Sequence, residues 1–381
     1  METCFFNPSS LTEGGGAENW IINVSKFLSS RHKIGIVALN YSTTKRLRFD
    51  EVTSLIDRVD YYEIPSVKLP RGVALPKPFY LSTLLNIFNS YDLVYIILPS
   101  PPLELMFYLS KMSIKSELVA GFHGFLRRDV LLQTLYFPLF KKTLTSFKTY
   151  HVLNWQTYIW LKGVCRFNNI FYIPNGVCSD LFQLCDDPSN SQSFNIIYSG
   201  RLTEDKGADI LVEIIRFVNE KLKLQKIKFM IVGSGTLDYM IKALAEKYSN
   251  VHYFGFVSHK ILPLIYRQGH LFLIPSRTEG MPLGLLEAQS SGLPAVGSNI
   301  PGILDVIING KTGRLIHPGD IESFAQAIKE YYLLWHYSPE QYRRINRTIR
   351  KHIVDNYDWK IILGKIEKMF EETLANTTSS L

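Results

Sequence analysis

The chain has 381 residues, of which 46% are hydrophobic and 20% charged, and its formal net charge is +8. This composition is typical of a folded globular protein and excludes intrinsic disorder, and the length predicts two domains of roughly 180 residues. The positive charge favours negatively charged partners such as phosphorylated small molecules or anionic lipid. It does not indicate nucleic acid, because the Lys and Arg residues are scattered and no nucleic-acid-binding motif accompanies them.

The cysteines and the first residues indicate the compartment. The four cysteines form no C-x-x-C pair, which indicates free thiols. The start, METCFFNPSS, has neither the basic nor the apolar segment of a signal peptide, and no run approaches the roughly 18 apolar residues of a membrane span. The sequence therefore predicts a cytoplasmic protein.

Short apolar runs alternate with amphipathic segments, which predicts parallel sheets covered by helices. After a short run at 3–6, the strands expected in the first half are 34–40, 92–99, 117–123, 149–154 and 170–174. A polar stretch with Pro and Ser at 183–193 is the expected linker. The strands expected in the second half are 194–200, 228–233, 251–256, 271–275, 293–297 and 312–317. Residues 357–374 are expected to form one long amphipathic helix.

This alternation predicts an α/β fold with two doubly wound, Rossmann-like domains. The expected domains are residues 1–182 and residues 194–355. Residues 356–381 are expected to form a C-terminal helix and tail that packs back on the first domain.

Loops after the strands of the second domain carry cations and small residues. In an open parallel sheet, ligands bind beyond the carboxyl ends of the strands. The loop SGRLTEDKG contributes Gly200, Arg201 and Lys206, and the loop VGSGT contributes Gly233. With a helix amino terminus near 283–285, these groups suit a diphosphate. Each signal alone is weak, because a single cation is more often solvated and VGSGT lacks the third glycine of a dinucleotide motif. Their shared edge favours one site.

Glu279 and Glu287 stand eight residues apart in a stretch of Gly, Pro and Leu. If a helix begins at 282–283, Glu287 lies in its second turn and Glu279 in the preceding loop. Eight helical residues rise about 12 Å, more than the roughly 5–9.5 Å between the carboxylates of a glycosidase. The pair therefore suits two hydroxyl-bearing groups of one long ligand, such as the hexose and ribose of a sugar nucleotide. The alternative, acids favoured at a helix start, explains Glu287 poorly.

These motifs resemble the signature of the retaining, GT-B-fold glycosyltransferases of family 4 (glycosyl transferases group 1), which include lipid mannosyltransferases, sucrose-phosphate synthases and bacterial glycogen synthases. The resemblance covers nearly the whole chain and rests on Glu279, GMPLGLL, EAQSSGLPAVGS and NGKTGRLIHPGD. It implies an acceptor-binding first domain, a nucleotide-sugar-binding second domain and a ligand cleft between them. It also implies that Arg201 and Lys206 bind the donor diphosphate, that Glu279 contacts the donor sugar and that Glu287 contacts the ribose.

Further donor contacts in the second domain follow from the same resemblance. They are implied for Gly200, Gly233, Met281, Pro282, Leu283 and Gly284. Asp305 stands where the family more often has Glu, a difference that preserves the charge.

The first domain carries three more stretches that resemble the family. EGGGAE at 13–18 resembles its glycine-rich loop beside the donor phosphate and the acceptor, which implies Gly15 and Gly16. GFHG resembles the strand end whose His faces the donor sugar, which implies His123. IPNGVCSDLF at 173–182 resembles the element that leads into the second domain.

The activity that the resemblance implies is transfer of a hexose from a UDP-, GDP- or ADP-hexose to a glycan or lipid-linked acceptor, with His123, Arg201, Lys206 and Glu279 in catalysis. Fixed cations and helix-terminal amides would stabilise the leaving diphosphate, so we expect no cofactor and no metal. No D-x-D motif offers a cation site; the nearest pair, at 186–187, is solvated charge in the linker. Two other hypotheses stay open. One is an epimerase-type enzyme of the same fold, and the other is a catalytically silent nucleotide-sugar-binding protein.

The segment 130–150 is compatible with contact with an anionic membrane. It is rich in Leu, Phe and Tyr and carries Lys141, Lys142 and Lys148. Such a face is suited to lie on the inner face of the cell membrane and to present a lipid-linked acceptor. A helix whose apolar side packs against its own sheet explains the segment equally well.

Overall fold

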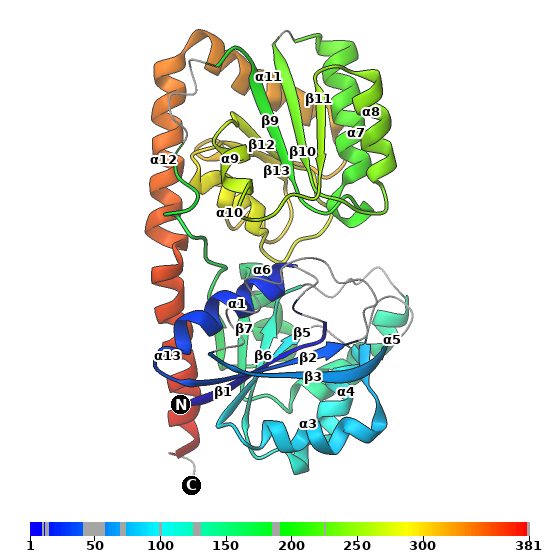
Figure 1. Cartoon of the computed structure of the whole chain (residues 1–381), viewed down its shortest axis with the longest axis vertical. Helices are drawn as coiled ribbons and strands as arrows, with labels where there is room; N and C mark the ends of the chain where they lie inside the picture. Colours follow the sequence, from blue (N-terminus) through cyan, green and yellow to red (C-terminus); the bar gives the residue numbers. More distant parts are fainter. Residues whose placement is uncertain are drawn as a thin grey trace. The chain divides into compact units, whose positions relative to one another are not determined.

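The computed structural model describes residues 1–9, 11, 15–40, 58–68, 74–98, 101–124, 131–184, 191–224 and 226–378. The chain divides into two compact α/β units, unit 1 (Met1–Pro174 with Ile362–Leu381) and unit 2 (Asn175–Ile361) (Figure 1). Three expected features lie partly outside the described residues. These parts are residues 13–14 of the glycine-rich loop, residue 130 of the basic segment and residues 185–190 of the linker, which include the acidic pair at 186–187.

Unit 1 is built on a sheet whose described strands run in the order β4-β3-β2-β1-β5-β6-β7-β8. They are β1 (Glu2–Asn7), β2 (Lys33–Asn40), β3 (Asp60–Lys68), β4 (Ala74–Pro76), β5 (Leu93–Leu98), β6 (Glu117–Phe122), β7 (Thr149–Val152) and β8 (Ile170–Tyr172). Neighbours pair in parallel except β3 and β4. All six residues of β5, LVYIIL, are buried, as expected for a parallel strand covered on both faces.

Helices cover both faces of this sheet. They are α1 (Gly16–Leu28), α3 (Leu81–Phe88), α4 (Pro101–Ser110), α5 (Leu131–Leu144), α6 (Trp155–Trp160) and α13 (Trp359–Thr378). Successive residues of a strand point to opposite faces. Accordingly Phe5 packs against Trp20 of α1 and Phe370 of α13, whereas Phe6 packs against Phe88 and Phe107 of α3 and α4.

Unit 2 contains a sheet of parallel strands in the order β11-β10-β9-β12-β13-β14. They are β9 (Phe194–Ser199), β10 (Ile227–Val232), β11 (Val251–Gly255), β12 (Leu271–Ile274), β13 (Ala295–Ser298) and β14 (Gly313–Ile316). The helices are α7 (Ala208–Phe217), α8 (Asp238–Lys247), α9 (Leu262–Tyr266), α10 (Leu283–Ser290), α11 (Ile321–Tyr337) and α12 (Pro339–Tyr357). Counted within the unit, the strand order is 3-2-1-4-5-6, that of a Rossmann fold, and the order reverses between β9 and β12.

The expected strands are all present, with ends that differ by at most two residues. β3 and β4 were not expected, because β3 mixes polar and aromatic residues around Pro65, and proline argues against an interior strand. The long C-terminal helix begins at Trp359 rather than at residue 357, because Asp358 takes extended dihedral angles (φ −63°, ψ 139°) and separates it from α12.

The boundary between the units lies before the expected linker at 183–193. Residues 175–182 group with unit 2, where the Asn175 side-chain amide donates to the Met281 carbonyl at 2.9 Å. The Phe182 carbonyl accepts a bond from the Arg350 guanidinium at 2.7 Å. Composition marked the polar stretch, whereas these long-range bonds set the boundary at Asn175. Residues 362–381 group with unit 1.

The basic segment around α5 packs partly against its own unit. Phe140 and Leu144 are fully buried in the core of unit 1, while Leu139 is exposed and Lys141 and Lys142 occupy the last turn. This burial agrees with the packing alternative for part of the segment. No helix in the described part of the chain combines the length and apolarity that crossing a bilayer requires.

Candidate functional site

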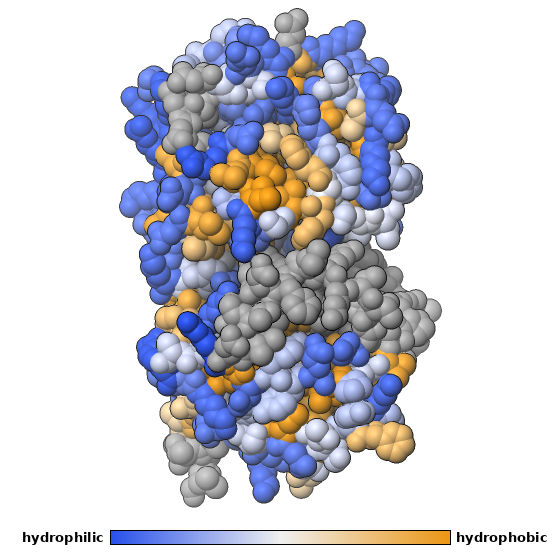
Figure 2. Space-filling view, in the orientation of Figure 1, coloured by the Kyte–Doolittle hydropathy of each residue, from blue (hydrophilic) through white to orange (hydrophobic). Residues whose placement is uncertain are grey.

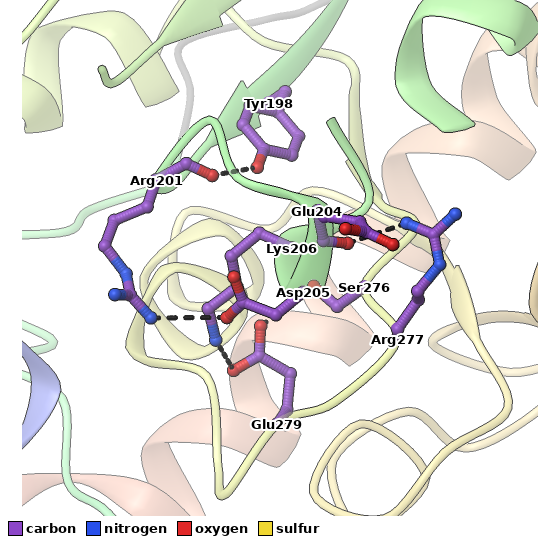
Figure 3. Close-up of polar contacts among 8 residues, drawn as sticks. All are labelled: Tyr198, Arg201, Glu204, Asp205, Lys206, Ser276, Arg277 and Glu279. Carbon is purple, nitrogen blue, oxygen red and sulfur yellow. Dashed lines mark hydrogen bonds and ion pairs between the residues drawn. The ribbon is translucent and has the colours of Figure 1, made fainter. Parts of the chain in front are cut away.

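Unit 2 brings two polar loops together at the point where its strand order reverses. β9 and β12 are hydrogen-bonded neighbours, so the loops that follow them leave the same edge of the sheet. The first loop carries the short 3-10 helix η7 (Glu204–Lys206). In the second loop the Arg277 amide donates to the Asp205 carbonyl at 2.9 Å. Figure 3 shows the side chains of both loops converging, with Glu279 beneath Lys206.

Two glycines allow the backbones to approach this closely. Gly207 has a φ of +67°, and a Cβ there would lie 2.1 Å from the Pro275 carbonyl oxygen. Gly233 has a φ of +129°, and a Cβ there would lie 1.8 Å from the Gly200 carbonyl oxygen. Side chains are excluded by both contacts, and the positive φ also favours glycine. The expected residues Gly200 and Gly233 therefore lie against each other through their backbones.

Lys206 and Glu279 form an ion pair between the two loops. Lys206 Nζ lies 2.7 Å from Glu279 Oε2, and Ser276 Oγ donates to Glu279 Oε1 at 2.8 Å. The Lys206 and Glu279 side chains are only 21% and 9% exposed. Both carboxylate oxygens are thus satisfied, as a buried charge requires. The sequence assigned these residues to different parts of a ligand, and the structure places them in direct contact.

Arg201 remains largely in solvent. Its guanidinium is 62% exposed and its Nη2 lies 3.3 Å from Asp205 Oδ2, a contact too weak and exposed to hold the side chain firmly. Burial acts to raise the pKa of Asp205, but the Thr203 hydrogen bond and the charges of Arg201 and Lys206 together lower it. Asp205 is therefore a carboxylate, and Arg201 can turn from it towards a ligand.

Arg277 locks the two loops together and was not among the expected site residues. Its guanidinium donates two bonds of 2.6 Å to the Asp209 carboxylate and one of 2.7 Å to the Glu204 carbonyl. The hydrogen bond from Arg277 lowers the pKa of Asp209, and the same bond raises that of Arg277. This planar two-pronged pairing is specific to arginine. Arg277 fixes the loop in which Glu279 lies.

Glu287 belongs to a second network. It lies in the second turn of α10, as expected, and is 6% exposed. His259 Nε2 lies 2.9 Å from its Oε1, and the Tyr266 hydroxyl lies 3.3 Å from its Oε2. Burial, with the charge of Glu287, raises the pKa of Tyr266, which keeps its hydroxyl a donor. The two glutamates therefore have no partner in common among the described residues.

The loop before α10 presents backbone to the same edge. Pro282 is the N-cap of α10 and Leu283 its first residue, so the amides of the first turn, including that of Gly284, have no acceptor within the helix. Met281 is buried, and its carbonyl accepts from the Asn175 side chain. The first-turn amides of α10 can therefore bind a ligand. The Met281 carbonyl, in contrast, is already bonded to Asn175.

An apolar surface adjoins the Glu287 network. Figure 2 shows hydrophobic side chains gathered on unit 2 over α9. Ile261 and Leu264 are 51% and 57% exposed there, two and five residues after His259. Exposed apolar surface of this kind often marks a binding region.

Unit 1 carries the other expected residues, Gly15, Gly16 and His123. Gly15 is the N-cap of α1 and Gly16 its first residue. Glu18, in the first turn, is buried and accepts a hydrogen bond from Ser9. A Cβ at Gly15 would lie 2.4 Å from Glu18 Oε2, so this glycine leaves room for the carboxylate.

His123 follows β6 at the carboxyl edge of the unit 1 sheet. Its Nε2 lies 2.9 Å from the Tyr95 hydroxyl, which lies 2.6 Å from His151 Nδ1. Burial and the neighbouring His151 lower the pKa of His123 well below its ordinary value. His123 is therefore neutral at neutral pH. Tyr95 and His151 were not anticipated from the sequence.

Comparison with known proteins identifies the fold. Residues 186–352 match the family model for glycosyl transferases group 1. The structure of HepE from Anabaena, in complex with UDP and glucose, has a TM-score of 0.76 and 18% sequence identity, with 100% of both chains covered. The chain has the GT-B fold.

Curated relatives match over part of their length. The capsular polysaccharide biosynthesis glycosyltransferase CapM of Staphylococcus aureus is 26% identical over 212 residues, 52% of this chain and 53% of CapM. The GtfA subunit of the UDP-N-acetylglucosamine–peptide N-acetylglucosaminyltransferase of Streptococcus pneumoniae is 30% identical over 194 residues, 50% of this chain and 38% of that protein. The matched part spans about half the length of these relatives or less.

The GT-B chain thus has its expected residues in two sets. Unit 2 gathers Gly200, Arg201, Lys206, Gly233, Glu279, Met281, Pro282, Leu283, Gly284 and Glu287 along one edge of its sheet. Unit 1 holds Gly15, Gly16 and His123 at the ends of its own elements. Within the described residues no three His, Cys, Asp or Glu side chains are grouped closely enough to hold a metal ion.

Proposed function

We propose that the protein is a retaining glycosyltransferase that moves a hexose from a nucleotide-sugar donor to a glycan or lipid-linked acceptor. The match of residues 186–352 and the GT-B fold support the class of reaction. The observation that carries the proposal is the meeting of Lys206 and Glu279 where the strand order of unit 2 reverses, the edge at which such sheets bind nucleotides.

Transfer requires stabilisation of the leaving nucleoside diphosphate. When the bond between the anomeric carbon and the phosphate oxygen breaks, negative charge develops on the diphosphate and positive charge on the sugar ring. The exposed Arg201 guanidinium, the Lys206 ammonium and the first-turn amides of α10 supply positive charge on one edge. In our proposal these groups take the role that a divalent cation fills elsewhere.

Lys206 and Glu279 together would mark the junction between diphosphate and sugar. An ammonium group has three N–H donors, and Glu279 occupies one of them. Within the described part of the chain the other two meet no acceptor, so in our proposal they bind phosphate oxygens. Glu279, held by Lys206 and Ser276, would accept hydrogen bonds from sugar hydroxyls and lie near the developing positive charge of the ring. The ion pair orients both groups before the donor arrives.

Glu287 and the surface over α9 would bind the nucleoside. A carboxylate is a good acceptor for the two hydroxyls of a ribose, and His259 and Tyr266 hold that of Glu287 in place. The exposed side chains of Ile261 and Leu264 are suited to contact the flat face of a base. GtfA is a subunit of a UDP-N-acetylglucosamine–peptide N-acetylglucosaminyltransferase, and the HepE structure is a complex with UDP and glucose; both favour a UDP-sugar.

Retention follows if the acceptor attacks from the face that the diphosphate leaves. The acceptor oxygen forms its bond to the anomeric carbon as the phosphate oxygen departs. The acceptor proton passes to that phosphate oxygen. Side-chain nucleophiles are not required, and the cations around Lys206 stabilise the departing charge.

Binding and turnover measurements test this function. Thermal stabilisation against UDP-, GDP- and ADP-sugars identifies the donor, and product analysis with and without candidate acceptors identifies the reaction. We expect transfer with retained anomeric configuration. An altered sugar without acceptor would instead establish an epimerase, and binding without any turnover would establish a silent binding protein.

A matched pair of lysine variants ties turnover to the site. Lys206→Met should lower kcat about a hundredfold, roughly 2.7 kcal/mol of barrier. Lys247 on the surface of unit 2 forms a similar pair with Glu220 at 2.9 Å, and Lys247→Met should leave kcat unchanged. Equal effects of the two substitutions would contradict a role for Lys206 in the reaction.

A further inference from the structure

Three aromatic side chains of unit 1 form a hydrogen-bonded chain that ends at His123. His151 of β7 lies with Nε2 2.8 Å from the Ile173 carbonyl oxygen. Its Nδ1 lies 2.6 Å from the hydroxyl of Tyr95 on β5, and that hydroxyl lies 2.9 Å from Nε2 of His123. The chain crosses neighbouring strands, because β6, which precedes His123, pairs with both β5 and β7.

Every hydrogen bond in this chain is donated in the same direction, from His123 towards the Ile173 carbonyl. A carbonyl oxygen only accepts, so His151 Nε2 carries a proton and donates to Ile173. Burial lowers the pKa of His151 to about 4, so the ring is neutral and its Nδ1 accepts from the Tyr95 hydroxyl. Tyr95 has then used its only hydrogen. It follows that His123 Nε2 carries a proton and donates to the Tyr95 oxygen.

His123 is left with an unprotonated Nδ1. The ring is neutral, so it holds one proton, which sits on Nε2. Among the described residues Nδ1 has no hydrogen-bond partner, and the side chain is partly exposed. A bare ring nitrogen accepts a hydrogen bond from a hydroxyl and repels an anion such as phosphate.

Close packing holds the hydrogen-bonded side chains of His123, Tyr95 and His151 in place. Trp20 of α1 stacks on Tyr95 with ring centroids 4.7 Å apart and meets His123 edge-on at 4.9 Å. Tyr95 and His151 are fully buried. A Cβ at Gly121 would lie 2.0 Å from the Tyr95 hydroxyl oxygen, so that hydroxyl occupies space which any other residue at 121 would take.

We propose that Tyr95 and His151 are positioning residues that hold His123 in the tautomer protonated at Nε2, with Nδ1 as the acceptor for a hydroxyl of the donor sugar. This inference rests on the proposed function for the identity of the ligand. The tautomer itself does not depend on that function. Tyr95 and His151 act only through His123 and touch no substrate.

Nitrogen-15 NMR of histidine-labelled protein tests the tautomer directly. We expect the His123 signals, assigned by their loss in His123→Asn, to show a protonated Nε2 and a bare Nδ1 at pH 7.5. In Tyr95→Phe the Nε2 proton loses its acceptor, and we expect a mixture of tautomers. A wild-type spectrum with the proton on Nδ1 overturns the proposal, and so does a Tyr95→Phe spectrum with an unchanged His123 signal.

Kinetics with a matched tyrosine control tests the consequence. Tyr150 on β7 is also buried, and its hydroxyl donates to the Leu144 and Phe147 carbonyls, so Tyr150→Phe removes a buried hydroxyl without touching His123. Tyr95→Phe should lower kcat about tenfold, the cost of roughly one hydrogen bond. Affinity for the free nucleoside diphosphate, which lacks the sugar, should stay within about twofold. Tyr150→Phe should leave kcat within the same margin.

The two arms separate this inference from the proposed function. If the protein turns over no nucleotide sugar, the proposed function fails and the wild-type spectrum still decides the tautomer. If turnover is found and Tyr95→Phe keeps full kcat with a mixed tautomer, the role in positioning is wrong. Should Tyr95→Phe not fold, the wild-type spectrum still decides the tautomer, because it needs no variant at position 95.

Discussion

Lys206 and Glu279 are 73 residues apart in the sequence and follow different strands, and the Lys206 ammonium nitrogen lies 2.7 Å from a Glu279 carboxylate oxygen. Glu287, eight residues beyond Glu279, binds His259 and Tyr266 instead. Nearness in sequence therefore does not place the two glutamates in one network. Each carboxylate has its own partners, so neutralising Glu279 and neutralising Glu287 should impair different steps of the reaction.

Neutral substitutions should separate the two glutamates. We expect Glu279→Gln to lower kcat about a hundredfold, because it weakens the ion pair beside the reacting sugar, while nucleotide affinity barely changes. Glu287→Gln should weaken binding of the free nucleoside diphosphate about tenfold. Titration calorimetry and initial rates measure both. Glu330→Gln, which neutralises the partner of Arg314 on the surface, is the control. Loss of nucleotide binding in Glu279→Gln, with binding retained in Glu287→Gln, would reverse the assignment.

Arg277→Lys should loosen the loop that carries Glu279. Lysine cannot reproduce the two parallel bonds to Asp209 or the bond to the Glu204 carbonyl. The pair is partly exposed, so we expect a loss of only about 1 kcal/mol in the free energy of unfolding. Urea denaturation measures the stability, and the KM for the donor should rise at the same time. A donor KM equal to that of the wild type would show that the Arg277 bonds to Asp209 and Glu204 do not contribute to donor binding.

Chelation should leave transfer intact. Arg201, Lys206 and the first turn of α10 supply the positive charge that the leaving diphosphate needs. Initial rates in EDTA should therefore equal those in magnesium or manganese. Abolition of turnover by EDTA, with recovery on adding either metal, would show that the proposed diphosphate site is wrong.

Acid should destabilise unit 1 through its buried histidines. Burial lowers the pKa of His151 from 6.5 to about 4 and lowers that of His123 as well. Between about pH 6.5 and pH 4 the His151 ring is protonated in the unfolded chain but neutral in the folded protein. The free energy of unfolding therefore falls as the pH falls. The His151 contribution amounts to about 3 kcal/mol at the acid end. Urea unfolding at several pH values should show a smaller pH dependence in His151→Gln than in the wild type. Equal slopes would mean that His151 is not held neutral.

Contact with an anionic membrane remains a prediction for the face around α5. Lys141 and Lys142 lie in the last turn of α5 and Leu139 is exposed, although Phe140 and Leu144 face the core. Binding to anionic vesicles should be present at low salt and lost at high salt. Cosedimentation of the wild type and of a Lys141→Glu, Lys142→Glu variant measures it. No binding of the wild type to anionic liposomes at low salt would remove the idea.

Local patterns were sufficient to predict most of the fold. Buried parallel strands such as β5 and β9 are short apolar runs, and such runs are visible in a sequence. β3 was not predicted because it contains Pro65 and mixes polar with aromatic side chains. The start of unit 2 escaped because it is set by bonds such as that from Asn175 to Met281, 106 residues away, and no local pattern encodes a partner at that distance.

The candidate site was predictable in its loops and not in its pairings. Strand ends identified the loops of Arg201, Lys206 and Glu279, because parallel strands end on one edge. The sequence did not reveal that Arg277 would bind Asp209 or that His259 would bind Glu287. Lone charged or histidine residues in loops have many compatible partners, and only the folded backbone selects one.

The grouping of residues 362–381 with unit 1 means that unit 2 is inserted into unit 1. During synthesis, all of unit 2 is made before Phe370 of α13, the residue that packs against Phe5 of β1. Until then the Phe5 side chain has Trp20 beside it but lacks its neighbour Phe370, so this face of β1 stays partly uncovered. The sheet of unit 1 therefore gains its last covering helix only after all of unit 2 has been translated.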